Sequence, residues 1–119
     1  MSNPDFTHIR SGQPTMVDIT GKSPNRRTAV AEARMELGAE IIGKFHNNDL
    51  QGPKGPVFQT AIIAGTMAVK KTSEFIPFCH PLPVENCEFR ITPDETGVAI
   101  RCEVSTTGKT GVEMEAMTG

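Results

Sequence analysis

The stretch GPKGPVFQTAIIAGTMAVKKTSEFIPFCHPLP, residues 52–83, decides how this chain folds. From Val57 onward its apolar side chains recur at helical spacing, which predicts a helix over residues 57–72. These side chains cover much of the helix circumference, and such a helix is normally buried on two sides. In a chain of 119 residues the second covering surface is expected to be another copy of the chain, so the pattern predicts an oligomer.

Both ends of this helix carry residues suited to chemistry. Lys54 precedes the helix start, where unpaired N–H groups and the helix dipole favour an anion, so we interpret it as a candidate for anion binding, the alternative being an ordinary solvated charge. At the other end, Cys79 and His80 stand between Pro77 and Pro81, whose rings restrict the backbone on both sides. We interpret His80 as a functional candidate, the alternative being an ordinary core or surface histidine. Cys79 is explained more simply as a small buried hydrophobe.

Alternation of apolar and polar side chains predicts strands elsewhere in the chain. It is clearest over residues 84–92 and 98–105, and Pro93–Gly97 supplies a hairpin turn between them. A shorter strand is expected at residues 16–19. The stretch HNNDLQGPKGP, residues 46–56, is rich in turn-forming residues and predicts a loop.

Residues 28–45 allow two interpretations. Their composition, rich in Ala, Glu and Arg, fits one helix. Their apolar residues also alternate strictly, which is a strand signal. A strand over residues 27–36 followed by a short helix over residues 38–46 is therefore an alternative, with Gly38 as the break between them.

The composition limits the classes of function. The chain is long enough for one domain, which we place at residues 16–119 behind a mobile arm of residues 1–15. A net charge of −2 gives no electrostatic reason to expect binding to nucleic acid or to an anionic membrane. Three cysteines without CxxC spacing argue against a disulfide framework and a zinc site. No apolar run indicates a signal peptide or a membrane span, so we expect a cytoplasmic protein.

Basic residues stand in small groups along the chain, which suits a small polyanion better than a polymer. The segment Gly108–Gly111, GKTG, resembles the end of a nucleotide-binding loop. The full motif needs a glycine where Glu103 stands, so we reject that interpretation. Glu113 and Glu115 are either a pair for acid–base chemistry or ordinary charges at a helix start.

Four segments together resemble the family of cyclic pyranopterin monophosphate synthases, the second enzyme of molybdenum cofactor synthesis. The segments are MVDITGK (16–22) with Arg27, KGPVFQTAIIAG (54–65), KKTSEFIPFCHPLP (70–83) and TGKTGVEMEAMTG (107–119). The resemblance runs in register from about Phe6 to Gly119. The PFCHP and TGKTGVEMEA blocks are long and unusual enough to make it specific.

The resemblance implies a reaction and an architecture. Members of the family convert a cyclised dihydro-GTP triphosphate into cyclic pyranopterin monophosphate and release pyrophosphate. They share a ferredoxin-like α+β fold, in which helices pack on one face of an antiparallel sheet. They assemble as a trimer of dimers with active sites at subunit interfaces. No cofactor and no metal is expected, and the strand interpretation of residues 27–36 is favoured.

The resemblance also assigns the site. We expect Lys54, His80 and Lys22 to act in catalysis. The expected substrate-binding residues are Phe78, Cys79, His80, Glu113, Met114, Glu115, Asp18 and Arg27. Cations at positions 22, 27 and 54 would bind the three phosphates, with Lys109 as a possible fourth. The acidic residues and His80 would bind the donor–acceptor edge of the pterin or move protons.

Two departures from the family pattern affect these expectations. Ile62 stands where many members carry an arginine. The family also continues past Gly119 with a helix that bears a catalytic aspartate and, three residues on, a catalytic lysine, so we expect the chain to be truncated and to bind without turnover. The alternative to the enzyme is therefore a fragment or paralogue that only binds pterin or phosphate. A purely structural trimerisation domain would leave the PFCHP and VEMEA blocks unexplained.

Overall fold

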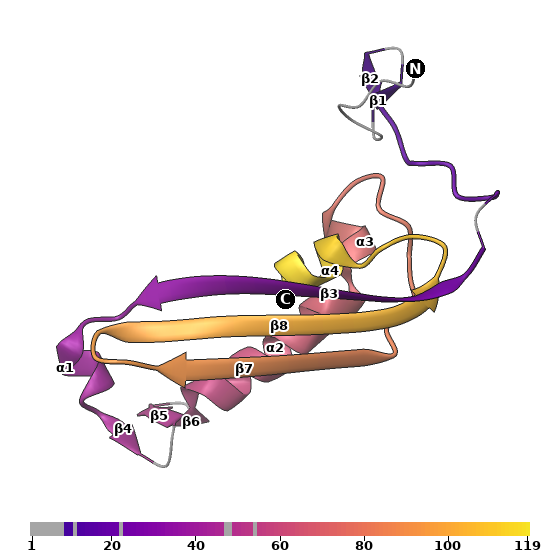
Figure 1. Ribbon diagram of the computed structural model, residues 1–119. Helices are drawn as coiled ribbons and strands as arrows, with labels where there is room; N and C mark the ends of the chain where they lie inside the picture. The colour runs from indigo at the N-terminus through magenta and orange to yellow at the C-terminus, as the bar shows by residue number, and fades with distance from the viewer. Residues whose placement is uncertain (1–8, 11, 22, 47–48, 54) are drawn as a thin grey trace.

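The computed structural model describes residues 9–10, 12–21, 23–46, 49–53 and 55–119. Its main sheet has three antiparallel strands in the order β3-β8-β7 (Figure 1). These strands are β3 (Asn25–Glu36), β7 (Asn86–Pro93) and β8 (Gly97–Gly108). The helices α2 (Val57–Lys70) and α4 (Glu113–Thr118) pack against one face of this sheet. The expected α+β class, with helices on an antiparallel sheet, is confirmed.

The core lies between the helices and this face of the sheet. Its buried residues come from α2, β8 and the start of α4, and they are Val69, Cys102, Val104, Val112 and Ala116. The register of β3 sets Ala29 opposite Val104 and Ala31 opposite Cys102. Because these alanines are small, α4 can approach both strands.

The strand interpretation of residues 27–36 is confirmed, and the single helix over residues 28–45 is wrong. β3 pairs with β8 along its whole length, so the alternating alanines share one face. A helix does follow Gly38, whose φ is +89°. This helix, α1 (Ala39–Ile42), is shorter than the expected 38–46 because the chain enters another strand at Phe45.

The expected helix 57–72 is present as α2, with a further turn, α3 (Thr72–Phe75), behind it. Gly65 lets α2 approach the sheet closely, since a Cβ at this position would lie 2.7 Å from Cζ of Phe89. The opposite side of the helix is uncovered in the single chain, where Ile63 and Met67 are 63% and 53% exposed. α2 is therefore covered by its own sheet on one side only.

A small second sheet occupies the region of residues 46–56, where a loop was expected. Its strands, in the order β4-β5-β6, are β4 (Phe45–His46), β5 (Asp49–Gly52) and β6 (Gly55–Pro56). The loop prediction is wrong. Strands of only two to four residues are too short to show an alternating pattern in the sequence. Figure 1 shows this sheet beside the start of α2, at the end of the molecule that also holds α1.

The hairpin predicted between residues 84–92 and 98–105 is confirmed as β7 and β8. Its turn is closed by Asp94, whose Oδ1 accepts hydrogen bonds from the backbone N–H groups of Thr96 and Gly97, each at 3.0 Å. The strand expected at residues 16–19 is wrong, since these residues form no strand in the structure. A short pair, β1 (Ile9–Arg10) and β2 (Gln13–Pro14), precedes them.

The described part of the chain contains no helix of the length and apolarity that a membrane crossing requires.

Candidate active site

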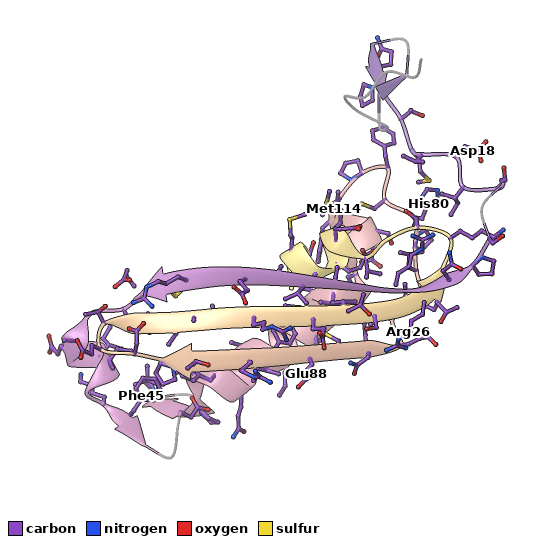
Figure 2. All side chains as sticks on the ribbon, viewed as in Figure 1. Asp18, Arg26, Phe45, His80, Glu88 and Met114 are labelled. Atoms are coloured by element: carbon purple, nitrogen blue, oxygen red, sulfur yellow. The ribbon has the colours of Figure 1, made fainter. Side chains whose placement is uncertain are left out.

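One hollow of about 360 Å³ gathers most of the residues that the sequence singled out. It is bordered by the start of β3, the turn after α3, the loop after β8 and the start of α4. The predicted residues that line it are Arg27, Phe78, Cys79, His80, Glu113, Met114 and Glu115. Figure 2 shows His80 and Met114 in the region of α3 and α4. The fold thus brings together three segments that are far apart in the sequence.

The turn between Pro77 and Pro81 presents its middle side chains to the hollow. Phe78 has a φ of +66°, a left-handed conformation that a bulky residue rarely adopts. Backbone strain of this kind persists where the surrounding structure holds it, and it is frequent at functional sites. The side chain of Phe78 is 43% exposed, so its ring is accessible to a ligand.

The segment after this turn is tied to the last residues of β8. The buried hydroxyl of Thr106 donates a hydrogen bond to the carbonyl oxygen of Pro83. The N–H of Glu85 donates to the carbonyl oxygen of Ser105 at 2.9 Å. These two bonds fix the turn that carries Cys79 and His80 relative to the main sheet.

Arg27 joins β3 to the last residue of β8. Its Nε donates a hydrogen bond to the carbonyl oxygen of Gly108 at 3.2 Å. Its other guanidinium N–H groups make no hydrogen bond to the residues that the structure describes, so they can bind an anionic group. The neighbouring Arg26 is exposed and projects from the opposite face of β3, as strand alternation requires.

Burial changes the acidity of two groups in the hollow. Glu115 is only 4% exposed, and burial, assisted by the charge of Glu113, raises the pKa of its carboxyl group. Burial, followed by the charge of Glu115, raises the pKa of the Cys79 thiol. Glu115 therefore keeps a proton more readily than an ordinary glutamate. Cys79 favours the neutral thiol, which agrees with its interpretation as a small hydrophobe rather than a nucleophile.

Four residues that line the hollow were not predicted, namely Val17, Leu82, Thr110 and Gly111. Gly111 has a steric reason to be glycine, because a Cβ at this position would collide with the carboxylate of Glu113. Each of the four is adjacent in sequence, or nearly so, to a predicted site segment. That adjacency is the signal in the sequence that could have identified them.

Asp18 is not among the residues that line this hollow, although its neighbour Val17 is. Oδ1 of Asp18 accepts hydrogen bonds from the backbone N–H of Thr20 at 3.0 Å and from the Thr20 hydroxyl at 2.8 Å. Figure 2 shows Asp18 at the same end of the molecule as His80. Lys22 lies outside the described residues, as does Lys54.

The neighbours of Lys54 in the sequence are far from the hollow. Pro53 and Gly55 lie beside the start of α2, whereas the turn with His80 follows the end of that helix. A helix of 14 residues spans about 21 Å. Within one chain, the hairpin that contains Lys54 and the hollow with His80 are therefore at opposite ends of α2 (Figure 1).

The start of α2 already holds an anion, the carboxylate of Asp49. Oδ1 of Asp49 accepts a hydrogen bond from the backbone N–H of Phe58 at 2.8 Å, and Oδ2 accepts one from that of Gln59 at 3.3 Å. Two of the N–H groups at this helix start are therefore already bonded within the chain, while the expected anion-binding role of Lys54 stays a prediction. No sequence pattern indicates the bonds to Asp49, because this residue stands well ahead of the helix and not at its N-cap, which is Pro56.

Known proteins are similar to this chain over nearly its whole length. A family model described as MoaC family matches residues 16–119. The cyclic pyranopterin monophosphate synthase of Xanthomonas oryzae pv. oryzae is 50% identical over 116 residues, covering 96% of this chain and 70% of its own length. The probable cyclic pyranopterin monophosphate synthase of Archaeoglobus fulgidus is 44% identical, covering 97% of this chain and 72% of its own.

A longer relative matches the whole chain. Molybdenum cofactor biosynthesis protein 1 of Dictyostelium discoideum is 46% identical over 138 residues, which cover 100% of this chain. The chain spans only 22% of that protein's length.

Proposed function

The chain belongs to the MoaC family, and we propose that it carries out the reaction for which its relatives are named, the formation of cyclic pyranopterin monophosphate. The substrate would be the cyclised dihydro-GTP triphosphate implied by the sequence resemblance, and the second product would be pyrophosphate. The observation that carries this proposal is the convergence of Arg27, the Phe78–His80 turn and Glu113–Glu115 on one hollow.

The polar groups of the hollow suit a pterin with a phosphate tail. Arg27 offers charge-assisted hydrogen bonds to a phosphate oxygen, and the exposed Phe78 ring offers a face on which a planar ring can stack. We assign Lys22 and Lys54 to the remaining phosphates, and Asp18 to a substrate contact at the edge of the hollow. Closing a cyclic phosphate with loss of pyrophosphate requires cations that stabilise the leaving group.

Proton transfers complete the reaction. An attacking hydroxyl group loses a proton, and the rearranging pterin rings exchange protons with the site. We assign this role to His80 and to Lys54 and Lys22, with Glu113 and Glu115 bound to the donor–acceptor edge of the pterin. Burial raises the pKa of Glu115, and its carboxyl group can form a hydrogen bond to that edge in either protonation state.

In a single copy the described neighbours of Lys54 lie apart from the hollow, and this supports the proposed oligomer. The hairpin with Lys54 is separated from the hollow by the length of α2, so a second copy would bring the two together. The uncovered apolar side chains on α2, Ile63 and Met67, give that copy a surface to cover. We propose an assembly of dimers, and the trimer of dimers of the family as its full form.

The fold supports the ferredoxin-like assignment. In chain order, β3, α2, β7, β8 and α4 match the first five elements of the β-α-β-β-α-β pattern, with α1, the small sheet and α3 inserted between them. We place the functional domain at residues 16–119, where the family match begins and ends, and propose a cytoplasmic location for the protein.

The test is to incubate purified protein with the cyclised triphosphate and to measure cyclic pyranopterin monophosphate and pyrophosphate together. Stoichiometric formation of both supports the enzyme. Saturable binding without either product favours the alternative, a module that binds pterin and phosphate. Absence of both binding and product contradicts the proposal.

A further inference from the structure

The carboxylate of Asp49 connects β5 to α2, whereas the hydroxyl of Thr60 in α2 donates a hydrogen bond to the carbonyl oxygen of Pro56 in β6 at 2.7 Å. Asp49 begins β5, and it is only 7% exposed. Its oxygens accept hydrogen bonds from the backbone N–H groups of Leu50 at 2.6 Å, Phe58 at 2.8 Å and Gln59 at 3.3 Å. The first bond stays within the β5–β6 hairpin, and the other two reach the first turn of α2. The hairpin is thereby tied to the helix at its base.

The first turn of α2 depends on this distant residue because its own N-cap cannot serve. Pro56 occupies the N-cap and makes no side-chain capping bond. The N–H groups of Phe58 and Gln59 are those that a side chain at the N-cap normally satisfies. Burial acts to raise the pKa of Asp49, but the bonds from backbone N–H groups outweigh it and hold the pKa below its usual range. The carboxylate is therefore charged at neutral pH.

The hairpin based on Asp49 is short and closed. Gln51 pairs with Pro56, and Gly52 pairs with Gly55, so that Pro53 and Lys54 are the only residues between the paired glycines in the sequence. A second contact steadies the same region, since the rings of Phe45 and Phe58 lie 5.0 Å apart between centroids. The contacts at the base of the hairpin, including those of Asp49, thus hold β5 and β6 in place beside α2.

We propose that Asp49 is a positioning residue for the reaction: its carboxylate fixes the hairpin of residues 49–56 on α2 and thereby sets where the segment that contains Lys54 is presented. The inference rests on the proposed function in one respect, the phosphate-binding role of Lys54. It goes beyond helix capping, because a cap at the N-cap position itself would satisfy the helix and leave β5 without its bond to α2.

Pro56→Asp supplies that separate cap. An aspartate at the N-cap can accept hydrogen bonds from the N–H groups of Phe58 and Gln59, and the backbone of Pro56, with φ −69° and ψ 128°, suits a capping residue. The double variant Asp49→Ala/Pro56→Asp therefore restores the capping of α2 without restoring the bond between α2 and β5.

The experiment compares the wild type, Asp49→Ala, the double variant and Lys54→Ala. Three quantities are measured: the thermal midpoint, hydrogen exchange of segments 49–56 and 57–70, and affinity for inorganic tripolyphosphate. We expect Asp49→Ala to lower the midpoint, to speed exchange in both segments, and to weaken tripolyphosphate binding about tenfold or more, as Lys54→Ala does. We expect the double variant to recover the midpoint and the protection of 57–70, while segment 49–56 and the affinity stay as in Asp49→Ala.

Recovery of affinity together with the thermal midpoint in the double variant would overturn the proposal, because Asp49 would then act only as a helix cap. Unchanged affinity in Asp49→Ala would overturn it as well. If the wild type binds no tripolyphosphate, the proposed function fails. The exchange of segment 49–56 in the double variant still decides the positioning role in that case, since protection equal to wild type would rule out an anchor.

Discussion

Nε of Arg27 donates a hydrogen bond to the carbonyl oxygen of Gly108 at 3.2 Å, joining β3 to the end of β8. This bond holds the guanidinium group at the edge of the hollow with its remaining N–H groups available. Arg27→Ala should therefore weaken binding of inorganic tripolyphosphate. The loss of one charge-assisted contact is worth ~1.5–3 kcal/mol, or about 10- to 150-fold in affinity.

Arg26→Ala is the matched control for this prediction, because Arg26 is adjacent in sequence, has the same charge and projects from the opposite face of β3. Isothermal titration of both variants measures the difference. Equal losses in the two would show that only the general charge matters, and that the hollow is not where the phosphates bind.

The close packing of α2 on the sheet makes a second prediction. A Cβ at position 65 would lie 2.7 Å from Cζ of Phe89, so Gly65→Ala forces the helix or the ring to move. Overpacking of this kind costs ~1–3 kcal/mol of unfolding free energy, measured by urea denaturation. Adding Phe89→Leu should remove part of the clash, so the double variant should be less destabilised than the two single losses add up to. Strict additivity would contradict the packing account.

These two predictions also show what sequence patterns could and could not predict. The hairpin of β7 and β8 and the helix α2 were predictable because each buries one face over many residues, which imposes a period on the sequence. The small sheet at residues 45–56 was not, because pairs of two residues impose no period. β3 stayed ambiguous in the sequence because alanine favours helices, and only its pairing with β8 settles it as a strand.

The site divides in the same way. The turn with His80 and the residues around Glu115 were found from short motifs, and the fold places them in one hollow. Asp49 was missed, because a carboxylate that caps a helix from a neighbouring strand leaves no mark at fixed spacing. The separation of this hollow from the hairpin of residues 49–56 could not be predicted, because it depends on how α2 packs in the fold and no short motif encodes that packing.

The raised pKa of Glu115 predicts a dependence of stability on pH. A carboxyl group whose pKa is higher in the folded than in the unfolded state favours folding while it is protonated. That contribution is fully present below the unfolded pKa of glutamate and is lost as the pH rises through the folded pKa. Glu115→Gln, which is neutral at every pH, should therefore be more stable than the wild type at pH 7.

Thermal melts at pH 7 and at about pH 4 test this point, since an ordinary glutamate has a pKa near 4.3. The advantage of Glu115→Gln should shrink at the lower pH. An advantage of equal size at both values, or a loss at pH 7, would show that Glu115 is stabilised as a carboxylate in the folded protein.

The separation of the two halves of the site by α2 predicts complementation between copies. Lys54→Ala and His80→Ala should each be inactive alone in the product assay. Mixed after joint refolding, they should regain activity, because some sites would combine an intact hairpin from one copy with an intact hollow from the other. Light scattering of the mixture checks that oligomers form. Oligomers without any regained activity would place both residues in a site within one chain.

The central claim is that the hollow between β3, the Phe78–His80 turn and α4 holds the cyclised triphosphate. Calorimetric titration of the purified protein with that compound tests it most directly. We predict saturable binding with one site per chain, weakened at least tenfold by His80→Ala and unchanged by Arg26→Ala. Binding by folded His80→Ala protein at wild-type affinity, or no binding by the wild type, would contradict the account.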